Sequence, residues 1–502
     1  MSSATALADP APSARIPYAF ARAHGVLAWR TEGDAVVVLL RPDATIEGIA
    51  ELKRVLNRPL VTRAVAAETF AAELSRAYNQ AGAALAMSEG LANEADLARL
   101  MQELPASEDL LEDSAQAPVI RMINALLLQA LRDRASDLHF EPYEARAVVR
   151  FRIDGMLRDI VEPPRALHGA LVSRLKIMAG LDIAEKRLPQ DGRIALKLGD
   201  RQVDVRVSTL PTGAGERVVL RLLDQEAARL DLATLGMSRE TLQAIDRLIL
   251  EPHGILLVTG PTGSGKTTTL YAALSRLPRG SANMMTVEDP VEYALDGVAQ
   301  TQVNPRIDLT FARALRAILR QDPDVIMIGE IRDLETAQIA VQASLTGHLV
   351  LATLHTNDAA SAITRLADMG VEPYLLASSL LGVLAQRLVR TLCEQCRTSS
   401  EPSAGERKLL DDLDLRTTQH VWQATGCANC NETGFAGRTG IYELLQIDDV
   451  LRRLIHDGAG ELALRDAALR AGMRRLRHDG ARLVADGSTS LAELTRVTRE
   501  ER

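Results

Sequence analysis

The sequence has few of the features that place a protein in or across a membrane. No stretch reaches about 18 consecutive apolar residues, the length that suggests a transmembrane helix. The opening segment, MSSATALADPAPSAR, has neither a basic region nor an apolar core, so we expect no secretory signal there. Any contact with a membrane should therefore run through a partner or a surface.

Cysteine is also scarce, and the chain has no excess of basic residues. The chain has four cysteines, all in its C-terminal part, which favours a reducing compartment and a metal site over a disulfide framework. The net charge is −8, and no basic patch with interleaved aromatic residues is evident. P-loop folds include nucleic-acid motors, but such motors need a basic surface, and this composition argues against one.

What is present is the composition of an ordinary globular protein, with 47% hydrophobic and 25% charged residues. The 502 residues allow roughly three domains. The patterning predicts a disordered tail, a small α/β unit, an acidic linker, an α+β domain and a large α/β domain. We assign them to residues 1–15, 16–80, 81–116, 117–230 and 235–502.

Periodicity and turn signals predict the elements within these domains. Expected strands lie at 35–40, 147–153, 195–198, 203–207, 217–223, 254–259, 284–287, 325–328 and 349–353. Expected helices lie at 46–56, 70–78, 119–131, 166–178 and 267–277, with another helix capped by Ser238. The α+β domain should have a mostly antiparallel sheet. From Leu235 onwards, strand and helix alternate, which predicts a parallel sheet with crossovers, and the tail from about residue 440 should be helical.

The stretch GPTGSGKTTT carries the pattern G-x-x-x-x-G-K-[ST] between a predicted strand and a predicted helix, the context of a phosphate-binding loop. Glycines let backbone N–H groups turn towards anionic oxygens, and the helix N-terminus adds a favourable dipole. Lys266 can reach the β- and γ-phosphates, and the Thr267 hydroxyl can ligate Mg²⁺. The predicted nucleotide-binding residues are Gly260, Pro261, Thr262, Gly263, Ser264, Gly265, Lys266, Thr267 and Thr268.

Two glutamates end predicted strands downstream of this loop. Glu288 follows residues 284–287, and Glu330 follows residues 325–328 in a Walker-B-like segment with Glu in place of the usual Asp. Ligands bind at the carboxyl ends of strands in open α/β sheets, so both side chains should lie near the nucleotide. Glu330 could orient or deprotonate the attacking water, and Glu288 could hold Mg²⁺ through water. Either glutamate could be the base.

Histidine and arginine supply further candidates. His348 and His355 flank the predicted strand at 349–353, where a histidine could sense the γ-phosphate or have a structural role. Phosphoryl transfer gains from a cation, often supplied by another domain or subunit. The arginines that could supply it are Arg206, Arg217 and Arg221 in the α+β domain, and Arg316 and Arg320 on one helix face. Surface ion pairing is the alternative role for all five.

The cysteines form two C-x-x-C pairs, Cys393 with Cys396 and Cys427 with Cys430. Two such pairs can build a tetrahedral Cys₄ zinc site, structural in kind because four thiolates leave no open position. The pairs stand about 30 residues apart, more than the roughly 15–20 of common zinc ribbons, so we expect residues 399–423 to loop out. The alternative is two redox pairs, although neither has a thioredoxin-like context.

Long motifs make the chain similar to the secretion ATPases of the GspE–PilB family, and most closely to the type II secretion branch. GPTGSGKTTTLY resembles the family's Walker A motif, TVEDPVEY its Asp box, LRQDPDVIMIGEIRD its Walker B motif and TGHLVLATLHTNDA its His box. SDLHFEP, RLPQDGR and DVRVSTLPTGAGERVVLRLLD resemble its second N-terminal domain. IPYAFARAHGVL resembles the first N-terminal domain of the type II members, and the paired C-x-x-C resembles the metal-binding insertion of extension-type members, here 390–433.

The resemblance implies a RecA-like P-loop core preceded by an α+β, PAS-like domain. It implies a homo-hexamer that hydrolyses ATP with Mg²⁺ at subunit interfaces, with Zn²⁺ in the insertion. By motif, Glu330 would be the catalytic glutamate, Arg206 and Arg221 would contact phosphate, and Arg316 and Arg320 would support the active interface. His355 lies in the His box.

The resemblance also implies partners and a location. Residues 16–80 would bind the cytoplasmic part of a bitopic inner-membrane protein, GspL-like, and a GspF-like platform protein would lie nearby. The chain would then be cytoplasmic and peripherally attached to the inner membrane of a Gram-negative bacterium, where it would power pseudopilus assembly. Some relatives have a longer first domain than this chain. A type IV pilus extension ATPase is the alternative, with the same chemistry and a different partner.

Overall fold

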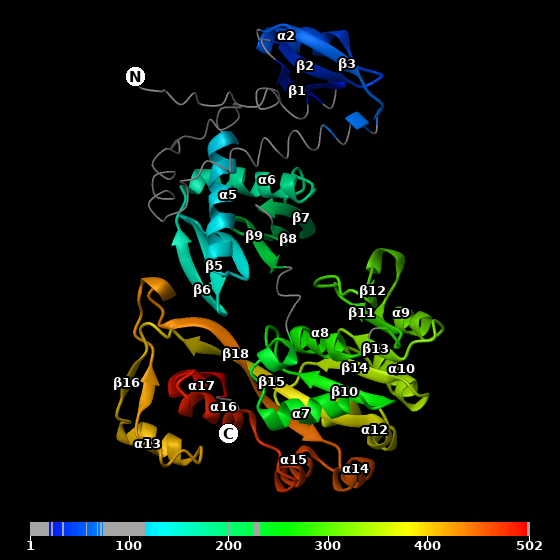
Figure 1. Ribbon diagram of the computed structural model, residues 1–502, viewed down its shortest axis with the longest axis vertical. Helices are drawn as coiled ribbons and strands as arrows, with labels where there is room; N and C mark the ends of the chain where they lie inside the picture. Colours follow the sequence, from blue (N-terminus) through cyan, green and yellow to red (C-terminus); the bar gives the residue numbers. More distant parts are fainter. Residues whose placement is uncertain are drawn as a thin grey trace.

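The computed structural model describes residues 20–21, 24–32, 35–56, 58–67, 69–70, 73, 116–198, 201–224, 231–278 and 280–498. The predicted tail, most of the predicted helix at 70–78 and the predicted linker up to residue 115 lie outside these residues. Figure 1 shows the described chain as a small N-terminal unit, a second unit built on a sheet, and a large α/β unit.

The small unit is a three-stranded sheet covered by one helix. Its elements are β1 (Val26–Glu32), β2 (Ala35–Leu40), α2 (Ile46–Leu56) and β3 (Leu60–Ala64). β1 and β2 pair antiparallel, whereas β3 joins β2 in parallel after the crossover through α2. Leu52 and Leu56 are buried on α2 and belong to the same apolar cluster as β1 and β2. The predicted strand at 35–40 and helix at 46–56 are confirmed.

The second unit has a six-stranded antiparallel sheet in the order β6-β5-β4-β9-β8-β7. Its elements are α5 (Gln116–Arg132), β4 (Asp137–Pro142), β5 (Ala147–Ile153), β6 (Met156–Val161), α6 (His168–Met178), β7 (Gln190–Leu198), β8 (Arg201–Thr212) and β9 (Gly215–Asp224). The two helices share one apolar core with the sheet. The antiparallel prediction is confirmed, but β4 is a strand that the sequence patterns did not predict.

The sequence patterns did not predict β4 because this strand buries both its apolar and its polar side chains. It therefore lacks the alternation of a half-exposed strand. The buried carboxylates are paired with arginines of the neighbouring strands. Glu141 contacts Arg150 and Arg217, and Asp137 contacts Arg221.

The large unit is built on a seven-stranded sheet in the order β12-β11-β13-β14-β10-β15-β18. Its first half contains α7 (Arg239–Leu248), β10 (Gly254–Thr259), α8 (Lys266–Arg276), β11 (Met284–Glu288), β12 (Val298–Gln302), α9 (Phe311–Ile318), β13 (Val325–Ile328), α10 (Leu334–Leu345), β14 (Leu349–Leu354), α11 (Ala359–Asp368), α12 (Pro373–Ser379) and β15 (Leu380–Leu392). All its strand pairs are parallel except β15 with β18. The predicted parallel sheet is thus confirmed for every strand but one edge strand.

The C-terminal part differs from the sequence prediction in two places. It contains β16 (Thr398–Ser400), α13 (Ala404–Asp411), β17 (Val421–Gln423), β18 (Phe435–Gln446), α14 (Asp449–His456), α15 (Glu461–Arg470), α16 (Leu476–Ala485) and α17 (Leu491–Val497). Residues 399–423 are not a bare loop, because Leu410 and Val421 pack in a cluster with α16 and α17. Helices dominate after residue 440 as predicted, but β18 runs on to Gln446 first.

The N-terminus of α7 is capped as the sequence predicts. The Ser238 side chain accepts a hydrogen bond from the Thr241 N–H, as the predicted cap requires.

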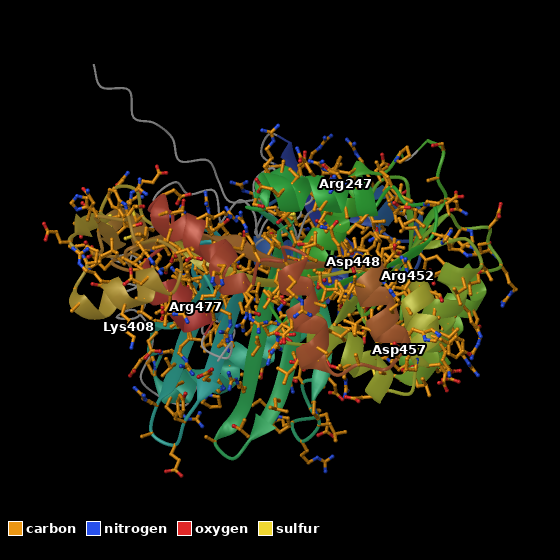
Figure 2. All side chains as sticks on the ribbon, turned by 90° about the horizontal axis from the view of Figure 1, so that it is seen from below. Arg247, Lys408, Asp448, Arg452, Asp457 and Arg477 are labelled. Atoms are coloured by element: carbon orange, nitrogen blue, oxygen red, sulfur yellow. The ribbon has the colours of Figure 1, made fainter. Side chains whose placement is uncertain are left out.

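In Figure 2, exposed charged side chains of both signs project from the surface, among them Arg247, Lys408 and Arg452. Among the described helices, none combines the length and the apolar character that a membrane span requires.

Candidate active site

The loop between β10 and α8 has the backbone of an anion-binding turn. Gly260, Gly263 and Gly265 have φ of 150°, 79° and 87°, in the region that favours glycine. A Cβ on Gly260 would lie 2.5 Å from the Gln386 carbonyl oxygen and 2.6 Å from the Ser264 Oγ, so no larger residue fits. The loop tip at residues 261–263 is exposed, Ser264 and Lys266 are buried, and Thr267 and Thr268 are half-buried on the first turn of α8.

Lys266 points back into this loop. Its Nζ donates to the carbonyl oxygens of Gly260 at 2.8 Å and Pro261 at 3.1 Å. Burial lowers the pKa of Lys266 to about 8, with Arg387 adding to the shift and Glu330 opposing it. An anion held by the loop would favour the charged ammonium form, so the side chain is suited to binding phosphate.

Three predicted residues meet beside the loop, at the carboxyl ends of β10, β13 and β14. The Lys266 Nζ lies 3.5 Å from the His355 Nδ1, and the His355 Nε2 lies 3.3 Å from the Glu330 Oε2. His355 is therefore the link between the loop lysine and Glu330. The Glu330 side chain is only 17% exposed, so it is largely shielded from bulk water.

Arg332 is a member of this group that the sequence reasoning missed. Its guanidinium donates to the Glu330 Oε1 and lies 3.8 Å from the Asp289 Oδ2. Because it follows Glu330 by two residues in GEIRD, its proximity to the acid could have been inferred from the motif. Arg332 holds one carboxylate oxygen of Glu330 while the other oxygen faces His355.

Glu288 lies in a different environment. It is 2% exposed, and it accepts hydrogen bonds from the Tyr271 hydroxyl, from the Thr286 Oγ1 at 2.5 Å and from the Gln300 Nε2 at 3.1 Å. Among the described residues, no hydrogen bond or ion pair joins Glu288 to Lys266, Glu330 or His355. Tyr271 comes from the inner face of α8, and burial, together with Glu288, raises the pKa of its hydroxyl.

Of the four arginines that the family resemblance singles out, only Arg206 reaches one of the site's loops. From β8 of the second unit, its Nη2 donates to the Val291 carbonyl oxygen at 2.8 Å and lies 3.1 Å from the Glu292 Oε2. Burial lowers the pKa of Arg206, with Glu292 opposing that shift. Arg206 thus crosses from one unit to the loop that follows β11.

The other three arginines have local partners. Arg221 donates to the Asp137 Oδ1 at 2.9 Å within its own sheet. Arg316 pairs with Glu335 at 2.6 Å, and Arg320 donates to the Arg316 carbonyl oxygen at 2.8 Å. Arg320 lies beyond the end of α9 at Ile318, so the prediction that it shares a helix face with Arg316 is wrong. The contacts of both residues in this chain lie outside the cluster around Lys266.

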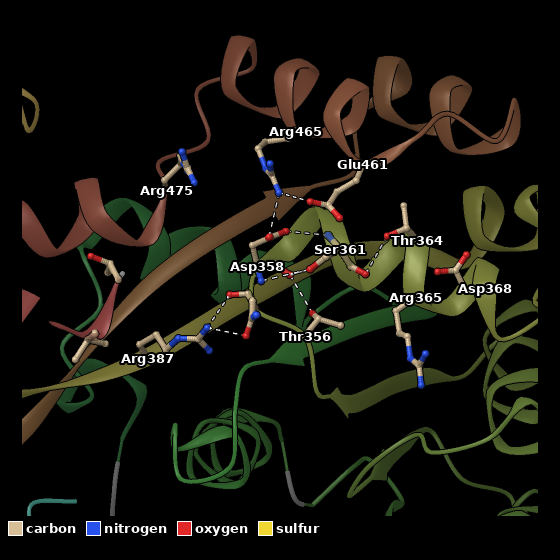
Figure 3. Close-up of a pocket in the computed structure, with 13 residues that line it drawn as sticks. Thr356, Asp358, Ser361, Thr364, Arg365, Asp368, Arg387, Glu461, Arg465 and Arg475 are labelled. Atoms are coloured by element: carbon tan, nitrogen blue, oxygen red, sulfur yellow. Dashed lines mark hydrogen bonds and ion pairs between the residues drawn. The ribbon is translucent and has the colours of Figure 1, made fainter. Parts of the chain in front are cut away.

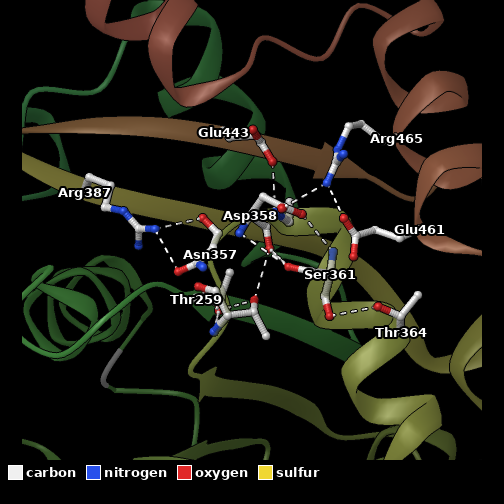
Figure 4. A network of polar contacts seen from close by, with 11 residues as sticks. Thr259, Asn357, Asp358, Ser361, Thr364, Arg387, Glu443, Glu461 and Arg465 are labelled. Atoms are coloured by element: carbon white, nitrogen blue, oxygen red, sulfur yellow. Dashed lines mark hydrogen bonds and ion pairs between the residues drawn. The ribbon is translucent and has the colours of Figure 1, made fainter. Parts of the chain in front are cut away.

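The segment after His355 lines a polar cavity of about 510 Å³ between the large sheet and the C-terminal helices (Figure 3). Asp358 caps α11 and also accepts a hydrogen bond from Arg465 on α15 at 3.1 Å. Thr356 is hydrogen-bonded to Thr259 at the end of β10, with 2.7 Å between their Oγ1 atoms. Figure 4 shows these contacts as one network, in which Arg387 donates to Asn357. The loop that carries His355 is therefore fixed from two sides.

The four cysteines form a compact cluster far along the chain from this site. The Sγ atoms of all four lie within 4.8 Å of one another, and the nearest pairs are 3.7–3.9 Å apart. A tetrahedral ion with bonds of about 2.3 Å to sulfur sets neighbouring sulfurs roughly 3.8 Å apart, so the cluster has the dimensions of a metal site. N–H groups of Cys427 and Gly434 point at the Cys430 Sγ and, against the effect of burial, lower the pKa of that thiol.

Comparisons with known proteins agree with this geometry. The family described as "Type II/IV secretion system protein" matches residues 112–496, and a domain family of "GSPII protein E" matches residues 15–78. The chain is 59% identical over 485 residues to "Type II secretion system protein HxcR" of Pseudomonas aeruginosa, covering 97% of this chain and 99% of that protein. It is 53% identical over 489 residues to "Type II secretion system ATPase E" of Vibrio cholerae, covering 97% of each.

Solved structures give the same fold. The pilus retraction motor PilT with bound ADP is 25% identical, with a TM-score of 0.51 over 74% of this chain and 95% of that chain. The ATPase DotB of Legionella pneumophila, 21% identical, matches in fold with a TM-score of 0.56 over 75% of this chain and 95% of that chain. The predicted RecA-like α/β fold is confirmed. The chain belongs to the type II/IV secretion system protein family, as an ATPase of the type II branch.

Proposed function

We propose that this ATPase works as a homo-hexameric motor that powers pseudopilus assembly in type II secretion, from the cytoplasmic face of the inner membrane. The observation that carries the chemistry is the convergence of Lys266, His355 and Glu330 beside a glycine loop. The match of residues 15–78 to a domain of GSPII protein E supports the type II system over a pilus-extension motor.

In this proposal the loop N–H groups and Lys266 bind the phosphates of ATP, and the Thr267 hydroxyl is the ligand offered to Mg²⁺. When bound, Mg²⁺ would neutralise phosphate charge. Glu330 orients or deprotonates the attacking water, and Arg332 keeps its carboxylate turned towards His355. Glu288 does not act as the base in this proposal. It holds α8 in place by accepting a hydrogen bond from Tyr271.

The second unit would complete the site with arginine. Arg206 already reaches the loop after β11, so a small displacement of that unit would move a cation relative to the nucleotide. We propose that Arg221, Arg316 and Arg320 act only across a subunit interface, since their contacts within one chain are local. The Cys₄ cluster would hold a structural Zn²⁺.

The role of Glu330 is tested by Glu330→Gln, which keeps the size of the side chain and removes its charge. We expect unchanged ATP affinity and a fall in kcat of about 100-fold or more, since general-base catalysis contributes that much. Glu251→Gln, at an exposed position before β10, is the matched control. Phosphate release at the wild-type rate from Glu330→Gln would show that another group activates the water.

The partner assignment needs a separate test. Full-length chain should bind the cytoplasmic part of a GspL-like bitopic protein, and removal of residues 1–80 should abolish binding. Binding instead to the platform of a pilus-extension system would favour the alternative. Cross-linking with a slowly hydrolysed ATP analogue should give a ladder that ends at six subunits.

A further inference from the structure

One buried amide lies directly beneath the nucleotide loop and belongs to none of the motifs named above. Gln386 is on β15, which runs parallel to β10, and Thr259 at the end of β10 is paired with Ala385. Gln386 is therefore one residue further along, under the loop that follows β10. It is 2% exposed, and a buried amide must find partners for both its oxygen and its nitrogen.

Both halves of the amide are bonded to the phosphate-binding segment. The Gln386 Nε2 donates to the Ser264 carbonyl oxygen at 2.6 Å, and the Gln386 Oε1 accepts from the Thr269 Oγ1 at 2.8 Å. A carbonyl oxygen can only accept, so the contact with Ser264 settles which end of the amide is the nitrogen. The side chain thus bridges the loop to the first turns of α8.

This contact fixes the orientation of one peptide plane in the loop. In a trans peptide the C=O and the following N–H point in opposite directions. Because the Ser264 carbonyl is held against Gln386 on the β15 side, the N–H of Gly265 must point away from β15. Such N–H groups are the donors with which a loop of this kind binds phosphate oxygens.

Close packing of β15 against the loop supports the same conclusion. A Cβ on Gly260 would lie 2.5 Å from the Gln386 backbone oxygen, and a Cβ on Gly265 would lie 3.2 Å from the Gln386 Nε2. The strand is therefore the floor of the loop: it excludes any side chain at Gly260, and it packs tightly against Gly265.

We propose that Gln386 is a positioning residue for nucleotide binding, which acts by holding the Ser264–Gly265 peptide with its N–H towards the phosphates. The inference rests on the nucleotide site proposed above. It predicts that changes at Gln386 weaken nucleotide binding in proteins that remain folded, and that the loss depends on the donor end of the amide.

The test compares Gln386→Leu, Gln386→Glu and wild type as full-length chains. Gln386→Leu leaves the Ser264 carbonyl without its donor, and Gln386→Glu places an oxygen against it. ADP affinity from calorimetry should fall about tenfold for Leu and further for Glu, as expected for an unpaired buried acceptor. KM for ATP should rise by a similar factor, with a smaller change in kcat.

Thr269 supplies a second, milder pair of variants. Thr269→Val removes the hydroxyl that orients the other end of the amide, and Thr269→Ser keeps it. Val should weaken ADP binding by a few-fold, and Ser should restore the wild-type affinity. Because these variants alter only one end of the contact, they keep the proposal testable if Gln386→Glu does not fold.

Melting temperatures without and with ADP separate positioning from mere stability. A positioning role lowers the ADP-dependent rise in Tm in the Gln386 variants. Wild-type ADP affinity in folded Gln386→Leu and Thr269→Val, with only the nucleotide-free Tm lowered, would overturn the proposal. A failure of the nucleotide site is distinguishable, because wild type would then bind ADP no better than Lys266→Ala.

Discussion

At the scale of single residues, Lys266 and Glu330 carry the two charges of the site, and their surroundings differ. Lys266 is buried among backbone carbonyls, and its pKa of about 8 reflects the cost of keeping an ammonium away from water. Glu330 is instead paired on both sides, because Arg332 and His355 face its two oxygens.

The lysine leads to a prediction about pH. Bound phosphate favours the ammonium form, so nucleotide binding above pH 8 should take up about one proton. At pH 9 roughly one-tenth of the free protein carries the charge, so ADP affinity should be about tenfold weaker than at pH 7. Calorimetry in buffers of different ionisation enthalpy measures both quantities.

The matched control is Lys408→Ala, which changes an exposed lysine on α13 (Figure 2). It should leave the proton uptake unchanged. Equal affinity for ADP at pH 7 and pH 9 in the wild type would mean that Lys266 stays charged throughout this range.

At the scale of elements, the segment after His355 joins the nucleotide site to the C-terminal helices. Asp358 does two things at once, since it caps α11 and pairs with Arg465 on α15. Both side chains are about one-fifth exposed, so the pair is better shielded than a typical surface ion pair.

We expect this pair to stabilise the chain measurably. Arg465→Met should lower the Tm by about 2 °C, which corresponds to roughly 1 kcal/mol in a domain of this size. Because Asp358→Asn removes the same attraction, the double variant should lose less than the sum of the two single changes. Thermal unfolding of the four proteins checks this.

The comparison pair is Arg452 with Asp449 on α14, an exposed i,i+3 contact at 2.8 Å. Its coupling should be at most about 0.5 kcal/mol. Strictly additive effects of Arg465→Met and Asp358→Asn would show that the two residues contribute independently.

At the scale of the whole molecule, the second unit contacts the large unit at both ends of its sheet. The Arg206 contact lies at the loop that follows β11, and a second set of contacts lies beside the cysteine cluster. There the Asn431 carbonyl accepts from Arg158 at 3.0 Å, and the Gly437 N–H donates to Asp154 at 3.0 Å. Asn431 directly follows Cys430, so the cluster positions a loop that touches the other unit.

Loss of a metal ligand should therefore affect both units. Cys430→Ser removes one of the four thiolates and should abolish zinc binding, which elemental analysis measures. Structural zinc contributes folding energy directly, so its loss should loosen the segment that it holds. Hydrogen exchange should rise around Asn431 and also around Asp154 and Arg158. Ser403→Ala, which removes the cap of α13 in the same segment, should leave zinc content unchanged. Purified wild type without any metal would contradict the zinc assignment.

Much of the fold could be predicted because its signals are local. The glycine loop, the Ser238 cap and the strands β10, β11, β13 and β14 follow from patterns of a few residues. The strands β6, β12 and β15 were also not predicted, but for β4 and β18 the physical reason is visible. β4 buries carboxylates against arginines of other strands, and β18 pairs with β15 across the cysteine segment, so neither is recognisable without its partners.

The same division holds for the site. Lys266, Glu330 and His355 could be named in advance, because each stands just beyond the end of an apolar strand and parallel strands bring such ends together. Residue types and spacing therefore suffice for the family, the phosphate loop and the cysteine pairs. The sequence could not show that Glu288 bonds to Tyr271, that Arg206 alone of the four arginines named by the resemblance reaches a loop of the site, or that Gln386 bonds to the nucleotide loop. Those contacts join residues far apart in the chain, and only packing of the folded units determines which buried polar groups become partners.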